Sequence, residues 1–291
     1  MTPLPIHLLP TVSPMLAETV LSVAAAGDII ACDFYVQGAE RGEEIPGGYR
    51  LGRLLNVDHH APTARMSRIV SSTNLAVAQL AAAPPQRATV VLNHGDCDSV
   101  LSGAIMAGLL APDPRYEAAA IAADHTGEAN PIADLLQALD PLRDLQFSLS
   151  SLDALEQGHP PEPIVRERLR NREMERRKAE QYVQEGRFHQ AGRLAWAVLD
   201  DKVDPIFFPA LLPDAWTILL AVPMPEHPGR WEAKLRLGMS APPGATLHDL
   251  AIRAFDPAFG GRWNAGSNRR AGGTAIRVEE YAAALQERMQ R

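Results

Sequence analysis

The first half of the chain alternates short apolar runs with longer stretches whose apolar residues recur every three or four positions. This alternation predicts β-strands that alternate with α-helices, and hence an α/β fold with a mainly parallel, doubly wound sheet. We expect strands at residues 28–34, 53–57, 89–93 and 118–123. We expect helices at residues 15–25, 72–82, 100–110 and 132–139.

The pattern changes after residue 158. Residues 163–187 mix arginine and glutamate at helical spacing, which predicts an exposed connecting helix, with a cationic ledge beside a nucleic-acid path as the alternative. Beyond it we expect strands at 194–199, 215–222 and 231–237 and helices at 247–255 and 278–289. The predicted organisation is a catalytic, metal-binding domain at 1–158, a charged helical linker at 159–189 and a smaller C-terminal α/β domain at 190–291.

Acidic residues and histidines stand where each of the four predicted strands of the first domain ends. In open α/β sheets, ligands bind beyond the carboxyl ends of the strands, and the four strand ends would bring these side chains together. The sequence therefore predicts a metal site at one edge of the sheet. Its candidate members come from four segments: Asp33; Asp58, His59 and His60; His94, Asp96 and Asp98; and Asp124 with His125.

The spacing of His94, Asp96 and Asp98 carries the clearest chemistry. Alternating residues of an extended segment point to the same side, so the three side chains can face one site. Carboxylate oxygens with an imidazole and no thiolate are typical ligands of Mn²⁺ or Mg²⁺. Alone, this segment is also compatible with a turn that caps a helix, and His59–His60 with a surface pair. The presence of both clusters at strand ends favours the metal site.

Several segments resemble the motifs of the DHH family of phosphoesterases. The segment NVDHHAPTARMSRIVSSTNLAVAQLA resembles the signature region, with a strand, Asp-His-His and a Ser/Thr-rich helix start. LNHGDCDSVLSGAIMAG resembles the metal-binding motif, IAADHTGE the later aspartate motif, and Asp33 of IIACDF the isolated aspartate. FGGRWNAGSNRRAGG resembles the substrate-binding glycine motif of the DHH-associated domain. Together these segments cover most of the chain.

The resemblance implies a role for each matched residue. Two divalent ions, with Mn²⁺ preferred and Mg²⁺ as the alternative, would be held by His94, Asp96, Asp98, Asp33, His59 and Asp124. Asp58 would orient the histidines and His60 would face the substrate phosphate, which makes these two the candidate catalytic residues. His125 is either a neighbour of the site or a structural residue. Substrate contacts would come from the glycine-rich segment, at Gly260, Gly261, Arg262, Asn264, Gly266, Arg269 and Arg270.

The chain departs from the family pattern in two respects. In the family the HxDxD-type motif precedes Asp-His-His, whereas here Asp33 and Asp58 come first, as a circular permutation would produce. Arg262 follows the glycines where the family has a histidine. A guanidinium also binds phosphate oxygens, so this departure bears on substrate identity more than on phosphate binding. The alternative for this segment is a glycine-rich turn with a solvated pair, Arg269 and Arg270.

The resemblance implies a hydrolase: a metal-dependent phosphoesterase that cleaves phosphodiester or phosphomonoester bonds of nucleotides or short single-stranded oligonucleotides, using water activated by two metals. One alternative is an inorganic pyrophosphatase or small-molecule phosphatase with the same metals. Another is a noncatalytic, nucleotide-binding regulatory module, although such a module should have lost ligand residues. No GxGxxG segment follows a predicted strand, which argues against a plain dinucleotide-binding domain.

Composition bears on the binding partners and the cellular location of the protein, but it does not identify the substrate. The 291 residues are 46% hydrophobic and carry a formal charge of −7, which argues against nonspecific coating of duplex DNA. Cys32 and Cys97 lack the spacing of a zinc site, which favours reduced thiols. With no leader-like or membrane-spanning pattern, we expect a cytoplasmic protein without a membrane partner. The sequence leaves the oligomeric state open, and a homodimer is one of the states that it allows.

Overall fold

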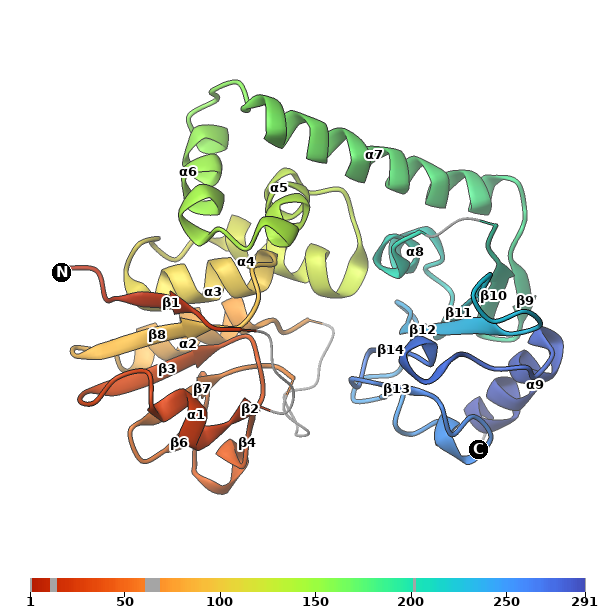
Figure 1. Cartoon of the computed structure of the whole chain (residues 1–291), viewed down its shortest axis with the longest axis horizontal. Helices are drawn as coiled ribbons and strands as arrows, with labels where there is room; N and C mark the ends of the chain where they lie inside the picture. The colour runs from red at the N-terminus through yellow and green to blue at the C-terminus, as the bar shows by residue number, and fades with distance from the viewer. Residues whose placement is uncertain (1, 11–14, 61–68, 201–202, 291) are drawn as a thin grey trace. The chain divides into compact units, whose positions relative to one another are not determined.

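The computed structural model describes residues 2–10, 15–60, 69–200 and 203–290 (Figure 1). By its internal contacts, the chain divides into two compact units. Unit 1 runs to Asp124 and resumes at Ala129–Arg172, whereas unit 2 comprises His125–Glu128 and Glu173–Arg291. Each unit contains a six-stranded sheet. Residues 61–68, part of the segment that resembles the DHH signature, lie outside the described residues.

The sheet of unit 1 has the strand order β1-β8-β3-β7-β6-β5. Its first four strands run parallel and its last two are antiparallel, which confirms the expected mainly parallel sheet. Three predicted strands, β8, β3 and β7, are neighbours. The strands are β1 (Ile6–Leu8), β3 (Asp28–Cys32), β5 (Glu43–Ile45), β6 (Gly48–Leu51), β7 (Leu54–Val57) and β8 (Ala88–Leu92), beside a small parallel pair, β2 (Met15–Leu16) and β4 (Val36–Gln37).

Helices follow three strands of unit 1: α1 comes after β2, α2 after β7 and α3 after β8. The helix α2 has the predicted bounds, and the expected helices at 100–110 and 132–139 are present with shifted ends. Within the stretch 15–25, where a helix was expected, only α1 is helical. Met15 and Leu16 form a strand that pairs with β4 instead. The helices are α1 (Ala17–Leu21), α2 (Ser72–Ala82), α3 (Cys97–Ala107), α4 (Pro114–Ile121), α5 (Pro131–Leu139), α6 (Leu145–Glu156) and the start of α7 (Pro163–Gln184).

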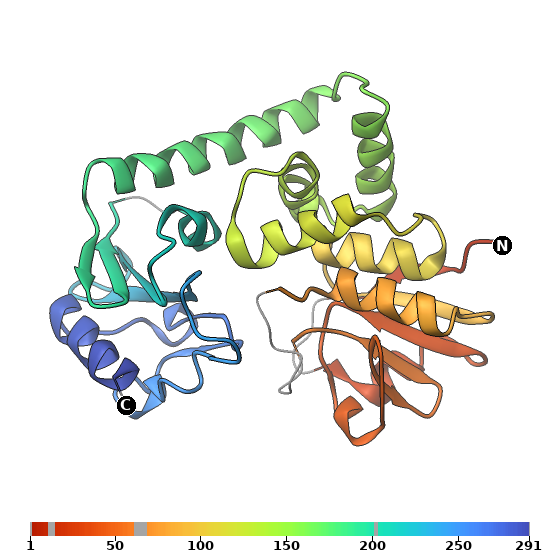
Figure 2. The ribbon, with the colours of Figure 1, turned by 180° about the vertical axis from the view of Figure 1, so that it is seen from behind.

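Both faces of the parallel strands are covered. Ile30 and Cys32 of β3 belong to the core that includes residues of α2 and α3. The alternate residues Ile29 and Ala31 belong to a second core, which includes Val20 of α1. Figure 2 shows α2 and α3 in front of the sheet, and Figure 1 shows α1 on its other face. Burial on both faces explains why these strands are continuous apolar runs in the sequence.

The strand predicted at residues 118–123 is wrong. Residues 118–121 belong to α4, and residues 122 and 123 begin the π-helical turn Ala122–Thr126 that follows it directly. Alanine has the highest helix propensity, and Pro114 occupies the first turn, where proline is well tolerated. The Asp113 carboxylate caps the helix by accepting a hydrogen bond of 2.8 Å from the Arg115 N–H. Asp124 is therefore presented by a helical turn and not by the end of a strand.

The sheet of unit 2 has the order β13-β14-β12-β11-β10-β9, in which only β10 and β11 are parallel. The expected C-terminal α/β part is thus confirmed, with a predominantly antiparallel sheet. Its core includes Ile218 of β11, Ala195 of β10 and Phe208. The elements are β9 (His189–Ala191), β10 (Leu194–Val198), α8 (Phe208–Leu211), β11 (Thr217–Pro223), β12 (Trp231–Leu237), β13 (Gly260–Gly261), β14 (Ala265–Ser267) and α9 (Val278–Met289).

The helix predicted at residues 247–255 is also wrong. Turns occupy this stretch, with a single 3₁₀ turn at Ile252–Ala254. Ala251 adopts a left-handed conformation with φ of +42°, which interrupts any continuous helix. Leu247, Leu250 and Ile252 are nevertheless buried, so their apolar side chains serve the core from an irregular backbone.

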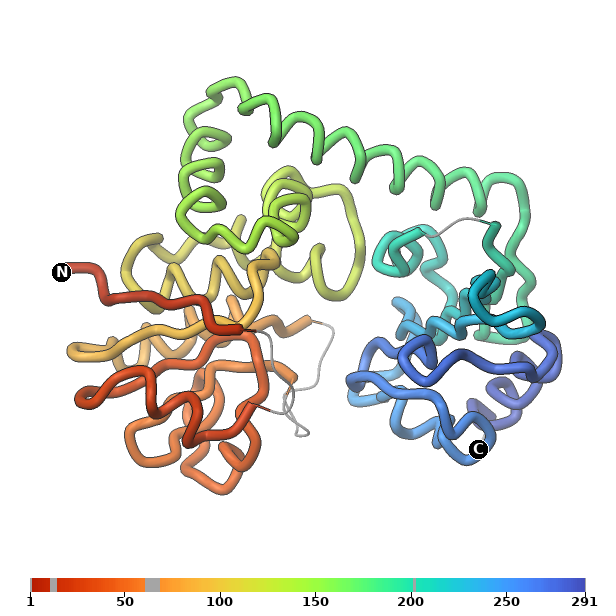
Figure 3. The backbone as a smooth tube through the Cα atoms, in the orientation of Figure 1, coloured from red at the N-terminus to blue at the C-terminus, as the bar shows by residue number. Residues whose placement is uncertain are grey.

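The charged stretch expected to be a helix forms α7, which Figure 3 follows along the chain. Several of its arginines have partners within their own unit. In unit 1, Arg172 pairs with Asp134 at 2.8 Å. In unit 2, the Arg176 guanidinium donates to the carbonyl oxygen of Gly127 at 2.6 Å. None of the described helices is long and apolar enough to cross a membrane.

Candidate metal centre

Asp33 stands immediately after β3 and is fully buried. Its backbone is left-handed, with φ of +62°, a conformation that aspartate tolerates better than most residues. The side chain of Asn56, on the neighbouring β7, supports this bend: it donates to the carbonyl of Phe34 at 2.9 Å and accepts from the N–H of Val36 at 2.9 Å. Hydrogen bonds to the backbone of the residues that follow Asp33 therefore fix the bend.

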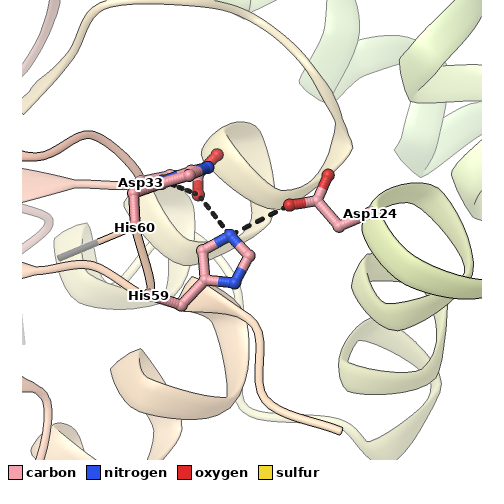
Figure 4. Close-up of side chains that lie close together, drawn as sticks. All are labelled: Asp33, His59, His60 and Asp124. Atoms are coloured by element: carbon pink, nitrogen blue, oxygen red, sulfur yellow. Dashed lines mark ion pairs between the residues drawn. The ribbon is translucent and has the colours of Figure 1, made fainter. Parts of the chain in front are cut away.

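His59 follows β7 and is completely buried. Its Nδ1 lies 3.1 Å from the carbonyl oxygen of Val70, which can only accept, so Nδ1 carries a proton. The other ring nitrogen, Nε2, faces carboxylates: it lies 3.0 Å from Asp124 Oδ2 and 3.6 Å from Asp33 Oδ1 (Figure 4). A histidine held by a carbonyl on one nitrogen and directed at acids through the other has the arrangement of a metal ligand.

His60 and Asp58 form a close pair beside this group. The Nδ1 atom of His60 lies 2.7 Å from Asp58 Oδ1 and 3.7 Å from Asp33 Oδ1. Asp58 is buried, whereas 14% of the His60 side chain is exposed. Burial opposes ionisation of Asp58, but the neighbouring His60 lowers the pKa of this carboxyl below its ordinary value. Asp58 is thus a buried carboxylate that orients a partly exposed imidazole.

His94 and Asp96 occupy the loop between β8 and α3. His94 Nε2 lies 3.1 Å from Asp33 Oδ2 and 3.3 Å from Asp96 Oδ2. Asp96 is also the N-cap of α3, because its carboxylate accepts from the Ser99 N–H at 3.1 Å. The two sequence interpretations of this segment, metal ligand and helix cap, are therefore compatible in the same residue.

Asp98 has a different environment from the other acids. Both of its oxygens accept hydrogen bonds from the start of α2: the Ser72 N–H at 2.7 Å, the Thr73 N–H at 2.7 Å and the Thr73 hydroxyl at 2.6 Å. His59 Nε2 is farther away, at 3.7 Å. The carboxylate thus joins α3 to the N-terminus of α2, where the unpaired N–H groups and the helix dipole favour a negative charge.

The described residues contain two groups of side chains that could hold a metal ion. One group is Asp33, His59, His60 and Asp124, and the other is Asp33, His94 and Asp96; within each group the ligand atoms lie within 4.8 Å of one another. Asp33 belongs to both. The structure therefore brings together the side chains predicted from four segments, with Asp98 beside them but in neither group.

The charges of the acids also suit a cation. Burial raises the pKa of Asp33 well above its ordinary value, and the nearby Asp98 and Asp96 raise it further. Burial likewise raises the pKa of Asp98. Carboxylates crowded in a buried space oppose one another's ionisation, and a divalent cation relieves that repulsion.

The pKa values of the histidines are also raised, which favours their positively charged form. Burial alone would lower the pKa of His59, but its contact with Asp124 raises it to about 9. Burial likewise opposes protonation of His94, yet Asp96 and Asp33 raise its pKa to about 12. Protons on these imidazoles supply the positive charge that a bound cation would supply instead. Carboxylate oxygens and imidazole nitrogens, with no thiolate in either group, fit Mn²⁺ or Mg²⁺.

The glycine-rich segment folds as the β13–β14 hairpin and the turn that follows it in unit 2. Two glycines are required by this hairpin. A Cβ on Gly261 would lie 2.3 Å from the Cα of Gly266, and a Cβ on Gly266 would lie 2.6 Å from the ring of Phe259. Gly260 differs, because a Cβ there would meet nothing within 4 Å. Close packing of the hairpin is enough to explain why positions 261 and 266 are glycine, and no ligand is needed to explain it.

The polar residues of this segment have mixed surroundings. Asn264 is buried, and its Nδ2 lies 3.3 Å from Nδ1 of His125. Arg269 is exposed but pairs with Glu226 at 2.9 Å and with Glu232 at 3.0 Å. Arg262 borders a pocket, and Arg270 is exposed. The predicted substrate contacts are therefore dispersed over the segment, with Arg269 held by two glutamates.

Sequence reasoning missed three residues that shape the metal centre. Ser72 donates its hydroxyl to Asp33 Oδ1 at 2.9 Å, and Thr73 holds Asp98. Asn56 supports the bend at Asp33. The only local signal was the run of serine and threonine before α2, which is typical of a helix N-terminus. The partners of these side chains are 20 to 39 residues away in sequence, so their roles depend on the fold.

Neither a scan of protein-family models nor a search of curated proteins gives a match to this chain. Solved structures with similar folds include the pGpG-specific phosphodiesterase PggH from Vibrio cholerae, at 11% identity and a TM-score of 0.47, covering 91% of this chain and 99% of that one. They also include an exopolyphosphatase-related protein from Bacteroides fragilis, at 15% identity and a TM-score of 0.40, covering 90% of this chain and 71% of that one. Similarities this distant do not by themselves assign an activity to the chain.

Proposed function

We propose that the protein is a divalent-metal-dependent phosphoesterase of the DHH type, which hydrolyses ester bonds of nucleotides or short oligonucleotides with Mn²⁺ as its preferred ion. The observation that carries the proposal is the position of Asp33, which lies in both groups of candidate ligands. A carboxylate shared in this way suits a pair of ions. When bound, such ions polarise phosphoryl oxygens and acidify water, which promotes attack on phosphorus.

The residues of the chain have separable roles in this proposal. Asp33, His59, His94, Asp96 and Asp124 hold the ions. His60 faces the substrate, and Asp58 orients its ring through the contact of 2.7 Å at Nδ1. The His60 ring can donate a hydrogen bond to a phosphoryl oxygen as the negative charge on that oxygen grows.

The test compares hydrolysis by the whole chain with and without its ligand side chains. We expect His59→Ala to abolish Mn²⁺-dependent hydrolysis, because Nε2 faces Asp124 and Asp33. The matched control is His159→Ala, at an exposed histidine of the same unit. Full activity of His59→Ala would refute the proposal, as would undiminished hydrolysis by the wild type in chelator.

The same assay separates the substrate classes. Pyrophosphate, a nucleoside monophosphate and a dinucleotide would be offered in parallel with Mn²⁺ or Mg²⁺. We expect release of phosphate or of a mononucleotide from the nucleotide substrates. Cleavage of pyrophosphate alone would favour the pyrophosphatase alternative, and binding without cleavage would favour a regulatory module.

A further inference from the structure

The loop that carries His94 packs against a distant turn of the same unit. The loop connects β8 to α3, and the turn is a single 3₁₀ turn at Asp140–Leu142, directly after α5. Arg143 ends the turn. Asp140 and Gly95, which are in contact, are 45 residues apart in the chain. The contact between turn and loop is therefore a product of the fold and not of local sequence.

The turn binds the residues on both sides of His94. The carbonyl oxygen of Asn93 accepts hydrogen bonds from the Arg143 guanidinium, whose two terminal nitrogens both lie 3.3 Å away. The Gly95 N–H donates to Asp140 Oδ1 at 2.9 Å. Asp140 and Arg143 thus act as a clamp on the loop. Because both neighbours of His94 are anchored, the starting point of its side chain is fixed.

The ring of His94 is directed as well. Its Nδ1 lies within hydrogen-bond distance of Oδ1 of Asn93, the residue that Arg143 binds. Its Nε2 lies 3.1 Å from Asp33 Oδ2 and 3.3 Å from Asp96 Oδ2, which are atoms of one candidate metal group. A partner on one ring nitrogen sets the direction of the ring and the nitrogen that is left for a metal. Asn93 therefore connects the clamp to the imidazole.

Arg143 is held in an unusual backbone conformation. Its φ is +51°, and its N–H donates to the carbonyl oxygen of Asp140 at 3.0 Å. A left-handed residue other than glycine is uncommon, and such strain is often retained where it directs a functional side chain. The guanidinium also donates to the carbonyl oxygen of Leu9 at 2.7 Å. Arg143 thus joins the turn to the segments that follow two paired strands, β1 and β8.

We propose that Asp140 and Arg143 are positioning residues for the metal, because they hold the loop in the geometry in which His94 Nε2 meets the cation. The proposal rests on the proposed function, since it concerns the same metal centre. Neither residue belongs to the two groups of candidate ligands among the described residues. Charge alone gives a different expectation, because a carboxylate attracts a cation at a distance and a guanidinium repels one. Positioning and charge therefore predict opposite effects of removing Arg143.

The first test measures the Kd of the whole chain for Mn²⁺ by calorimetry, in the wild type and in Arg143→Gly. Glycine accepts the left-handed backbone, so the guanidinium is lost while the turn keeps its shape. We expect the Kd to rise about 10- to 100-fold, which is the usual effect of removing an outer partner of a metal ligand. Loss of a repelling charge alone would lower the Kd instead. Arg87→Ala is the matched control, at an exposed arginine just before β8 that should leave the Kd unchanged.

The second test compares Asp140→Asn with Asp140→Ala. Both changes remove the negative charge, but asparagine keeps an oxygen that can accept from the Gly95 N–H. We expect Asp140→Ala to bind Mn²⁺ at least about tenfold more weakly than Asp140→Asn. In chelator, the Gly95 N–H should exchange with solvent faster in Asp140→Ala than in Asp140→Asn, as measured by nuclear magnetic resonance. Should Arg143→Gly be unfolded in chelator, the two Asp140 variants decide the question alone.

The proposal is overturned if folded Arg143→Gly binds Mn²⁺ as tightly as the wild type, or if the two Asp140 variants bind it equally. A failure of the proposed function gives another result. Wild-type protein that binds Mn²⁺ in the expected order of variants, yet hydrolyses none of the phosphate substrates, would remove the phosphoesterase and leave the clamp. Wild-type protein that hydrolyses them with Mn²⁺, while all variants share its Kd, would remove the clamp and leave the phosphoesterase.

Discussion

At the scale of single residues, the metal centre depends on the exact surroundings of Asp33. Its carboxylate receives the Ser72 hydroxyl on Oδ1 and lies near His94 on Oδ2. Its left-handed backbone directs the side chain away from the line of β3. Such a conformation costs free energy in most residues and persists where the surrounding structure enforces it. Here the hydrogen bonds of Asn56 provide that enforcement.

Asp33→Asn tests whether this residue serves stability or metal binding. Asparagine tolerates a left-handed backbone and keeps the shape of the side chain. Because burial raises the pKa of Asp33, its ionised form destabilises the fold above the ordinary pKa of aspartate, and the penalty is relieved as pH falls. We therefore expect the metal-free variant at pH 7 to unfold at or above the wild-type temperature.

Mn²⁺ should then separate the two proteins. At about 100 times its Kd, a ligand stabilises the folded state by about 2.7 kcal/mol, and we expect this gain in the wild type and not in Asp33→Asn. Asp28→Asn is the control, at the opposite end of β3 in a partly exposed pair with Arg50. It should respond to Mn²⁺ like the wild type. An equal response of Asp33→Asn would remove Asp33 from the metal site.

At the scale of elements, local sequence predicted structure well where an element's own residues decide it. The helix at 72–82 has a capping box at Ser71 and Asn74, and the strand at 231–237 is buried along its whole length. Prediction failed at 118–123, where a run of alanines was taken for a buried strand although their propensity and the Asp113 cap favour a helix. It failed again at 247–255, where apolar residues are buried without regular structure.

In the candidate site, too, some features were predictable from local sequence and others were not. Asp33, His59, His94 and Asp96 were named from motifs and strand ends, and they do lie together. The hydrogen bonds that connect elements were not foreseen. Asp98 was predicted as a metal ligand from its spacing, and that role stays a prediction, but both of its oxygens accept from α2. Such a connection requires α2 and α3 to be neighbours in space, which no local pattern specifies.

Thr73→Val tests this connection between α2 and α3. The change keeps the side-chain shape and removes the hydroxyl that donates to Asp98 Oδ1 at 2.6 Å. A hydrogen bond to a charged group contributes about 1.5–3 kcal/mol, so we expect a loss of that size in chelator, measured by denaturant unfolding. Thr89→Val in β8 is the matched control, since the Thr89 hydroxyl has no hydrogen bond to a described residue. Equal stability of the two variants would show that the Thr73 hydroxyl contributes nothing to the connection between Asp98 and α2.

At the scale of the whole molecule, the chain consists of two compact units with separate hydrophobic cores. The candidate metal ligands all belong to unit 1. The four tryptophans, Trp196, Trp216, Trp231 and Trp263, all belong to unit 2. Tryptophan fluorescence therefore follows the unfolding of unit 2, whereas far-ultraviolet circular dichroism follows both units.

This distribution predicts that a metal ion separates the two unfolding signals. Mn²⁺ bound at Asp33, His59 and Asp124 stabilises unit 1, because a ligand raises the stability of the folded unit that binds it. We expect Mn²⁺ to move part of the circular-dichroism transition to higher temperature and to leave the midpoint of the fluorescence transition unchanged. If both signals shift together with Mn²⁺, the two units unfold as one cooperative body, and the confinement of the metal site to unit 1 does not extend to stability.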